Sequence, residues 1–374
     1  MTERIDQVLR EWPPGYGGVE RVAHELASAW GGTVHSFDVQ SRSCAEVDAL
    51  PVTYERVLLP CTPALARLRL PLPSRRLWKL LRSKTPLHGH LPSPGVLLLL
   101  LLARLCRPRR CVSAHWHCFL EHDGSFNGAL YSFYQWLALR MLPSMSQVVT
   151  TSPLLAEELI RSGCAAERVR VLPCSLSAEQ EAACLDLQAV PLNRDQPFTL
   201  IFIGRLDSYK RLDWLLQAMT QIPSPWCLEV VGDGPRRRDF QELANALFAD
   251  SQSRRVHFHG RVDESAKQDL LARSQLLVLP SDRCNEAFGI VQLEAMAAGL
   301  PVLAFQRRRS GMGWVGALPD LQWDQTPQAL PEVLKRLAAD AQWRQQLGEQ
   351  ARERYLQRFA RAIWLRSLDA MRAR

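Results

Sequence analysis

Residues 198–219, FTLIFIGRLDSYKRLDWLLQAM, decide the fold of this chain. An apolar run at 198–203, interrupted only by Thr199, is followed by a loop that contains a glycine, an aspartate and basic side chains. Apolar residues then recur at helical spacing through 211–219. A short apolar run without alternation is typical of a strand buried on both faces, and the later spacing predicts an amphipathic helix. The stretch therefore predicts a strand, a polar loop and a helix in succession.

The same strand-loop-helix unit repeats downstream. Strands are expected at 226–231, 256–259, 276–280 and 301–305, and helices at 235–248, 264–273 and 289–298. Such alternation predicts a parallel sheet covered on both faces, as in Rossmann-like domains. Ligands of these domains bind on loops at the carboxyl ends of the strands.

The N-terminal half shows a less regular form of the same pattern. Strands are expected near 5–9, 33–37, 110–114, 147–151 and 169–172, and helices at 19–30 and 153–162. Residues 175–195 have mixed polarity and no clear strand pattern, so we expect the interdomain junction there. The chain is predicted to be an α/β protein with Rossmann-like domains at 1–180 and 195–350. A final helix, 351–374, is expected to return to the first domain and brace it.

The composition, 47% hydrophobic and 22% charged over 374 residues, is that of an ordinary soluble protein. The longest aliphatic run, 96–102, is far shorter than the ~20 residues that cross a bilayer, and it predicts a buried core helix. Ten cysteines occur without a CxxC pair, which favours reduced thiols. The N-terminus has no pattern of a secretory signal, so a cytoplasmic location is expected.

Two cations lie on the loop that follows the first strand of the C-terminal half. Arg205 offers a planar fork and Lys210 a mobile point charge, a combination that suits a diphosphate. A solvated loop that carries two charges is the alternative.

A second candidate segment is EAFGIVQLE, in which Glu286 and Glu294 are separated by seven residues. If Gly289 opens a helix, Glu286 lies on the preceding loop and Glu294 about one and a half turns inside. Two such carboxylates could accept hydrogen bonds from hydroxyls of one extended ligand. The amides of Phe288, Gly289 and Ile290 would form an anion site at the helix N-terminus. The alternative is a capped amphipathic helix with an incidental acid.

Taken together, several segments resemble a known family: IGRLDSYKRLDWLLQAM, VVGDGP, VHFHGRV, LLVLP and EAFGIVQLEAMAAGLPVLA. In this order and spacing they are similar to the nucleotide-binding domain of the GT-B-fold retaining glycosyltransferases of family 4, over roughly residues 145–305. The resemblance implies two Rossmann-like domains whose parallel sheets face each other across a cleft. It also implies that Arg205 and Lys210 bind the diphosphate of the sugar donor, that Glu294 holds the ribose hydroxyls and that Glu286 contacts the transferred sugar.

The resemblance extends to three further places. Gly232, in the loop after 226–231, would line the base pocket, although a plain turn explains it as well. In the N-terminal half, Gly17 and Gly18 would let backbone amides approach a phosphate. His117 would face the reacting sugar, with His115 as the less favoured alternative. Simple glycine turns are the alternative for the glycines, and a surface or chance metal-binding pair is the alternative for the histidines.

The chain contains no DxD motif and no carboxylate cluster with a divalent-metal layout, so neither a metal nor a cofactor is expected. Arg205, Lys210 and backbone amides would neutralise the leaving diphosphate instead. The sugar donor is expected to carry UDP or GDP. One segment departs from the family pattern: after the last strand, FQRRRSGMG replaces a turn of the form Gly-Gly-x-x-Glu.

We therefore expect a metal-independent, retaining transfer of a hexosyl group to a hydroxyl of a cell-envelope glycolipid or saccharide. A nucleotide-sugar epimerase of the same fold and a non-catalytic sugar-nucleotide-binding subunit are the alternatives. Nucleic acid is not an expected partner, because the cations lack a recognisable nucleic-acid module.

The last feature is a basic segment, residues 65–90, with seven cations and no acidic residue. Leucines and Trp78 lie between the cations, and prolines confine any helix to about 74–84. Basic residues are attracted to anionic lipid, so peripheral contact with the inner face of the cytoplasmic membrane is expected. The alternative is a helix that packs on the N-terminal sheet and has a solvated basic side.

Overall fold

The computed structural model describes residues 4–11, 17–38, 52–63, 69–121, 126–187, 197–223, 225–249 and 253–372. The chain divides into two compact units. The first comprises Met1–Cys174 together with Leu365–Arg374, and the second comprises Ser175–Trp364. The division between units thus falls at the start of the expected junction, 175–195.

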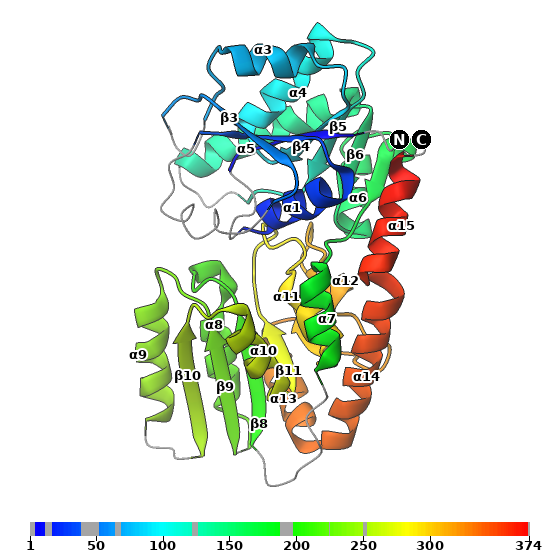
Figure 1. The fold of residues 1–374 in the computed structure, drawn as a ribbon. Helices are drawn as coiled ribbons and strands as arrows, with labels where there is room; N and C mark the ends of the chain where they lie inside the picture. Colours follow the sequence, from blue (N-terminus) through cyan, green and yellow to red (C-terminus); the bar gives the residue numbers. More distant parts are fainter. Residues whose placement is uncertain are drawn as a thin grey trace. The chain divides into compact units, whose positions relative to one another are not determined.

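A parallel sheet of order β3-β2-β1-β4-β5-β6-β7 organises the described part of the first unit (Figure 1). Its strands are β1 (Asp6–Leu9), β2 (Thr33–Phe37), β3 (Glu55–Leu59), β4 (Leu87–Leu91), β5 (Val112–Trp116), β6 (Gln147–Thr150) and β7 (Val169–Val171). The accompanying helices are α1 (Gly18–Trp30), α3 (Arg75–Arg82), α4 (Pro94–Cys106), α5 (Phe126–Met141) and α6 (Pro153–Arg161), with the part of α15 (Arg361–Arg372) that begins at Leu365. Because all strands run the same way, their carboxyl ends lie on one edge.

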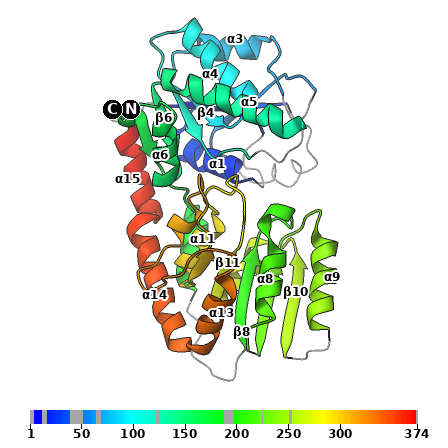
Figure 2. The same ribbon diagram turned by 180° about the vertical axis from the view of Figure 1, so that it is seen from behind.

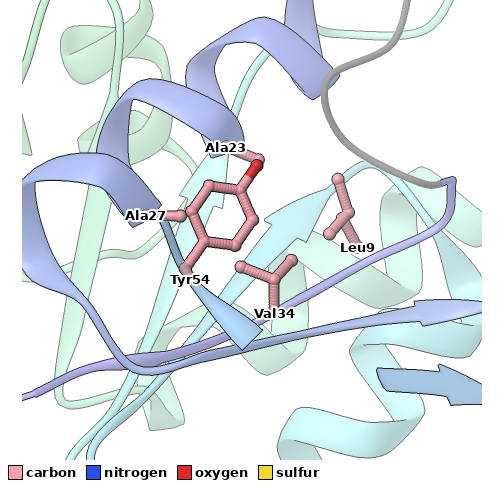
Figure 3. Close-up of a cluster of buried hydrophobic side chains, with 5 residues drawn as sticks. All are labelled: Leu9, Ala23, Ala27, Val34 and Tyr54. Atoms are coloured by element: carbon pink, nitrogen blue, oxygen red, sulfur yellow. The ribbon is translucent and has the colours of Figure 1, made fainter. Parts of the chain in front are cut away.

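A cluster of buried side chains joins α1 to the sheet (Figure 3). Its members are Leu9 of β1, Val34 of β2, Ala23 and Ala27 of α1, and Tyr54, which precedes β3. The two alanines let the ring of Tyr54 and the branched side chains pack closely against the helix. The contact fixes where α1 begins relative to the end of β1.

The second unit has a parallel sheet of order β10-β9-β8-β11-β12 in its described residues (Figures 1 and 2). Its strands are β8 (Phe198–Ile203), β9 (Trp226–Val231), β10 (Arg254–Gly260), β11 (Leu276–Leu279) and β12 (Val302–Ala304). The helices are α7 (Ala178–Asp186), α8 (Leu212–Met219), α9 (Arg237–Phe248), α10 (Glu264–Ala272), α11 (Val291–Ala297), α12 (Met312–Val315), α13 (Leu330–Ala339) and α14 (Ala341–Arg358).

Three expectations are corrected by the structure, and some elements had not been expected. The helix after Phe288 begins at Val291 and not at Gly289, which places Glu294 in its first turn. The expected junction contains the helix α7, whose capping box is formed by Ser177 and Gln180. The C-terminal helix is two helices, α14 and α15, separated at Phe359 and Ala360. The first unit also contains β3, β4 and α5, which the sequence analysis did not identify.

The aliphatic run 96–102 lies in α4, where Val96, Leu99 and Leu100 are buried, so the expected core helix is confirmed. Every helix of the described residues is too short or too polar to span a bilayer.

Candidate functional site

Two loops at the carboxyl ends of β8 and β9 are in direct backbone contact. The amide of Gly204 donates to the carbonyl of Val231, and the amide of Leu206 donates to the carbonyl of Asp233. Gly232 has a φ of 128°, and a Cβ built there would lie 1.9 Å from the carbonyl oxygen of Gly204. Only glycine therefore fits at this position, because both its backbone angle and the neighbouring loop exclude a side chain. The loop predicted to bind the diphosphate and the loop predicted to line the base pocket are therefore held together by these contacts.

Lys210 and Glu286 form an ion pair at this edge of the sheet. Lys210 ends a short 3₁₀ helix, η3 (Ser208–Lys210), after β8, whereas Glu286 lies on the loop after β11. Lys210 is only 8% exposed. Two further contacts hold the same loops together: the amide of Asp282 donates to the carbonyl of Tyr209, and Arg211 Nε lies 3.7 Å from Asp282 Oδ2. The structure thus brings two predicted site residues together, 76 positions apart in the chain.

Arg205 differs from Lys210 in its surroundings. Its side chain is 61% exposed, and its Nε lies 3.6 Å from Asp207 Oδ2. An exposed pair at this distance contributes little to stability, so the guanidinium can turn toward a ligand at small cost.

Glu294 is 1% exposed and pairs with Lys267 of α10, whose Nζ lies 2.8 Å from Glu294 Oε2. The same ammonium lies 2.9 Å from Glu264 Oε2. Burial alone would lower the pKa of Lys267, but the carboxylates of Glu294 and Glu264 outweigh it and raise the pKa. The sequence analysis missed Lys267. Its local signal is the spacing Glu264-x-x-Lys267 on one helix face, which does not point to Glu294.

The loop before α11 is held by buried packing and by side-chain contacts. Phe288 is buried edge-on against Phe359, with ring centroids 6.0 Å apart. Gly289 has a φ of 68°, and Ile290 caps the helix. Gln292 Nε2 donates to the carbonyl of Phe288 at 2.6 Å. These contacts fix the backbone of the segment that contains Glu286 and Glu294.

The segment that departs from the family pattern supports this loop. Ser310 Oγ donates to the carbonyl of Glu286 at 2.7 Å, and the amide of Gly311 donates to the carbonyl of Ala287 at the same distance. Arg307 lies over the ring of Phe305. The segment therefore positions Glu286 by hydrogen bonds to its backbone, a role that the sequence analysis did not identify.

In the first unit, Gly17 caps α1 and Gly18 is its first residue. Gly15, which belongs to the same expected loop, lies outside the described residues. The carboxylate of Glu20 folds back over this end of the helix, since a Cβ built on Gly17 would lie 2.0 Å from Glu20 Oε2. Burial raises the pKa of Glu20. The place expected for a phosphate is thus covered by a flexible side chain of the same helix.

His117 lies one residue beyond β5 and is buried with three other histidines. His90 Nδ1 is 2.8 Å from His117 Nε2, and His88 Nε2 is 3.3 Å from His115 Nδ1. Side chains of neighbouring strands complete the network: His90 Nε2 contacts Gln7 Oε1, and His88 Nδ1 contacts Ser113 Oγ. His115 and His117 stack with centroids 4.0 Å apart.

Burial lowers the pKa of all four imidazoles, to about 3 for His88 and His117. They are therefore neutral at physiological pH. His117 Nε2 is engaged with His90, which leaves Nδ1 for a ligand.

Two groups in the described residues have ligand atoms close enough for a metal ion. The first is His88, His90 and His115, which contains no carboxylate or thiol to offset a divalent charge. The second is Cys227, Glu229 and His257, on β9 and β10 of the second unit. The first group includes His115, the less favoured candidate to face the reacting sugar, whereas the second includes no residue predicted to bind the sugar donor.

Two family models match the chain. Residues 186–354 match the model described as "Glycosyl transferases group 1", and residues 16–180 match "Glycosyltransferase Family 4". The first model contains all the predicted donor-binding residues of the second unit. The second contains Gly17, Gly18 and His117.

Named relatives show partial similarity. The D-rhamnosyltransferase WbpZ of Pseudomonas aeruginosa is 29% identical over 62% of this chain and 60% of its own length. The sulfoquinovosyl transferase SQD2 of Arabidopsis thaliana is 26% identical over 62% of this chain and 43% of its own length. The matched region thus spans less than two thirds of each relative.

Solved structures match over nearly the whole chain. Anabaena Alr3699/HepE in complex with UDP has a TM-score of 0.75 at 18% identity and covers 98% of this chain and 99% of its own. Sucrose-phosphate synthase of Thermosynechococcus elongatus has a TM-score of 0.70 at 21% identity, with 99% of each chain covered. These matches show the GT-B fold. The two family models, which together match most of the chain, show that it belongs to the group 1 glycosyltransferases of family 4.

Proposed function

We propose that this protein transfers a hexosyl group from a nucleotide-diphosphate sugar to a hydroxyl acceptor. The observation that carries the proposal is the pair of Lys210 and Glu286 at the carboxyl edge of the second sheet. A cation and a carboxylate that face each other there are suited to the two parts of a sugar donor, its diphosphate and its sugar hydroxyls. Family membership supports the same reaction.

In the proposed complex, the diphosphate replaces Glu286 as the partner of Lys210. Glu286 then accepts hydrogen bonds from the sugar, and Arg205 turns in from solvent to share the phosphate charge. Glu294, whose charge is already balanced by Lys267, accepts from the ribose hydroxyls without an added charge imbalance. Gly232 and its loop lie against the base. Lys210 and Arg205 would neutralise the leaving diphosphate without a metal.

We propose retention of the anomeric configuration by front-face attack. The bond from the anomeric carbon to the diphosphate breaks as the acceptor oxygen bonds to that carbon. The acceptor proton passes to the departing diphosphate, which becomes a nucleoside diphosphate. In the first unit, His117 Nδ1 would contact the sugar, and Glu20 must leave the α1 N-terminus before a phosphate can approach Gly17 and Gly18.

Similar proteins favour a uridine nucleotide and a glycan or lipid acceptor. The Anabaena HepE structures contain UDP and UDP-glucose, and a further similar structure is a lipopolysaccharide outer core galactosyltransferase, WaaB. We therefore propose a UDP-sugar as the sugar donor and a cell-envelope glycolipid or saccharide as the acceptor.

A thermal-shift panel of UDP-, GDP- and ADP-sugars tests the proposal. A bound sugar nucleotide at ~100 times its Kd stabilises the protein by ~2.7 kcal/mol, which corresponds to a Tm increase of about 5–10 °C. We expect this shift for UDP-sugars and slow release of UDP without an acceptor. The Lys210→Met variant should lose the shift, whereas Arg238→Ala, an exposed change on α9, should keep it.

A new sugar isomer without nucleotide release would instead indicate an epimerase. Stabilisation without turnover of any donor would indicate a non-catalytic subunit.

We also propose that the exposed side of α3 contacts the anionic inner face of the cytoplasmic membrane. The leucines of this helix, Leu77, Leu80 and Leu81, are buried and pack inward, so they do not form a face toward a membrane. Trp78 is the apolar side chain left exposed on α3, and Arg82 lies 5.0 Å from its ring centroid. The exposed cations of the helix are Arg75, Arg76, Lys79 and Arg82. An indole among cations suits the headgroup region of an anionic bilayer.

Vesicle co-sedimentation tests this contact. A triple variant, Arg75→Gln, Lys79→Gln and Arg82→Gln, should bind anionic vesicles about 100-fold more weakly, since each cation contributes ~1 kcal/mol. Arg76 is left unchanged because it donates to the carbonyl of Leu58. A matched control replaces three exposed arginines elsewhere, Arg238, Arg358 and Arg366. Equal binding of wild type to neutral and anionic vesicles, or equal losses in both triple variants, would contradict the proposal.

A further inference from the structure

A cluster of potential metal ligands lies on β9 and β10, apart from the proposed sugar-donor residues. Glu229 of β9 is paired in register with His257 of β10. Cys227 lies two residues before Glu229, and His259 lies two residues after His257. Because side chains alternate along a strand, all four project from the same face of the sheet.

Three residues of this cluster, Cys227, Glu229 and His257, have ligand atoms close enough together for one metal ion. Cys227 Sγ lies 3.6 Å from His257 Nδ1 and 3.8 Å from Glu229 Oε1, and His257 Nδ1 lies 3.3 Å from Glu229 Oε2. His259 Nε2 lies 2.5 Å from Glu229 Oε2. Zinc bonds of about 2.0–2.3 Å place ligand atoms roughly 3.3–3.8 Å apart at tetrahedral angles. The ligand atoms of Cys227, Glu229 and His257 already lie within 4.8 Å of one another, whereas His259, which contacts Glu229 Oε2, would have to move to become the fourth ligand.

The charges and the burial of the cluster also suit a divalent cation. A thiolate and a carboxylate would neutralise the ion, and two imidazoles would complete four ligands. Cys227 and Glu229 are buried, whereas the side chain of His257 is 47% exposed and gives the ion a route from solvent.

Arg273 orients the carboxylate. Its NH2 lies 2.9 Å from Glu229 Oε1, while Glu229 Oε2 faces the two histidines. This is the kind of outer contact that fixes a metal-ligating carboxylate. Metal binding would release the proton of the Cys227 thiol to solvent and form the metal–sulfur bond.

We propose that Cys227, Glu229, His257 and His259 bind one zinc-class transition-metal ion. The ion would join the edge strand β10 to β9. It would also steady the loop predicted to hold the base, because Gly260 follows His259 and its carbonyl accepts the amide of Gly232 at 2.7 Å.

Cobalt(II) and zinc titrations of the full-length, metal-free protein test the proposal. We expect one cobalt per chain with a sulfur-to-cobalt charge-transfer band and tetrahedral d–d bands. Zinc at ~100 times its Kd should raise the Tm by about 5–10 °C. Cys227→Ser should abolish the charge-transfer band. His257→Gln, at an exposed position that folding does not require, should weaken zinc binding by at least about tenfold, since it removes a direct ligand.

Cys106→Ser is the matched thiol control, because Cys106 is exposed at the end of α4. This variant should bind cobalt as wild type does. Three results would overturn the proposal: no zinc-dependent rise in Tm, cobalt binding without a sulfur band, or wild-type affinity in both Cys227→Ser and His257→Gln. Cobalt binding without the sulfur band would point to the histidines of β4 and β5 instead.

Discussion

Replacement of Lys210 by methionine is expected to lower kcat/KM for the sugar donor by about 10²–10³-fold, the usual effect of removing one preorganised charge from a developing anion. Lys210 is the most buried cation among the residues expected to contact the diphosphate. Methionine keeps most of the side-chain volume and removes the charge. The Arg238→Ala variant, which changes an exposed arginine in the same unit, should keep wild-type turnover.

A double-mutant cycle with Glu286→Gln separates the catalytic role of Lys210 from a structural one. Lys210→Met leaves the carboxylate of Glu286 without its cation, so the single variant should also be less stable. The double variant should regain stability, because it removes both charges, yet it should remain inactive. If the double variant recovers both Tm and turnover, Lys210 serves only as the partner of Glu286. Wild-type turnover of Lys210→Met at subsaturating sugar donor would exclude the diphosphate role outright.

The strands of the second unit could be predicted because their signals are local. The bounds of β8 and β9 agree with the apolar runs at 198–203 and 226–231. Apart from Glu229, the residues of these two runs can be recognised as buried from the local sequence alone. The family motifs then placed the polar site residues at the ends of these strands.

The elements that the sequence analysis missed depend on distant partners. The sequence of β4 is LHGHL. Its two histidines and its glycine interrupt the apolar pattern by which a buried strand is recognised, although the structure buries the whole strand. These imidazoles are tolerated inside because they hydrogen-bond to β5 and β1. Lys267 was missed in the same way, because its main partner, Glu294, lies 27 positions along the chain. Contacts between residues that lie far apart in the chain produce no periodic pattern in the sequence.

The four neutral histidines His88, His90, His115 and His117 are expected to make the first unit sensitive to acid. In the unfolded chain each imidazole titrates near its ordinary pKa of 6.5, whereas burial holds the folded-state pKa lower. Below pH 6.5 the unfolded state therefore binds more protons, and stability falls as the pH falls. Four such groups together give a slope of about 5 kcal/mol per pH unit. Since a domain has only about 5–15 kcal/mol of stability, we expect cooperative loss of the first unit within about two pH units.

Urea unfolding at intervals between pH 7.5 and 5, in the presence of a chelator, measures this slope. His90→Gln removes one buried imidazole and keeps a group that can hydrogen-bond to Gln7. The number of protons taken up on unfolding should then decrease by about one, whatever the change in the free energy of unfolding at pH 7. Leu105→Ala, an exposed change of a non-titrating residue in the first unit, should leave the slope unchanged. A wild-type uptake of fewer than about two protons on unfolding near pH 5.5 would mean that the imidazoles are already charged in the folded protein, and the neutral network would be wrong.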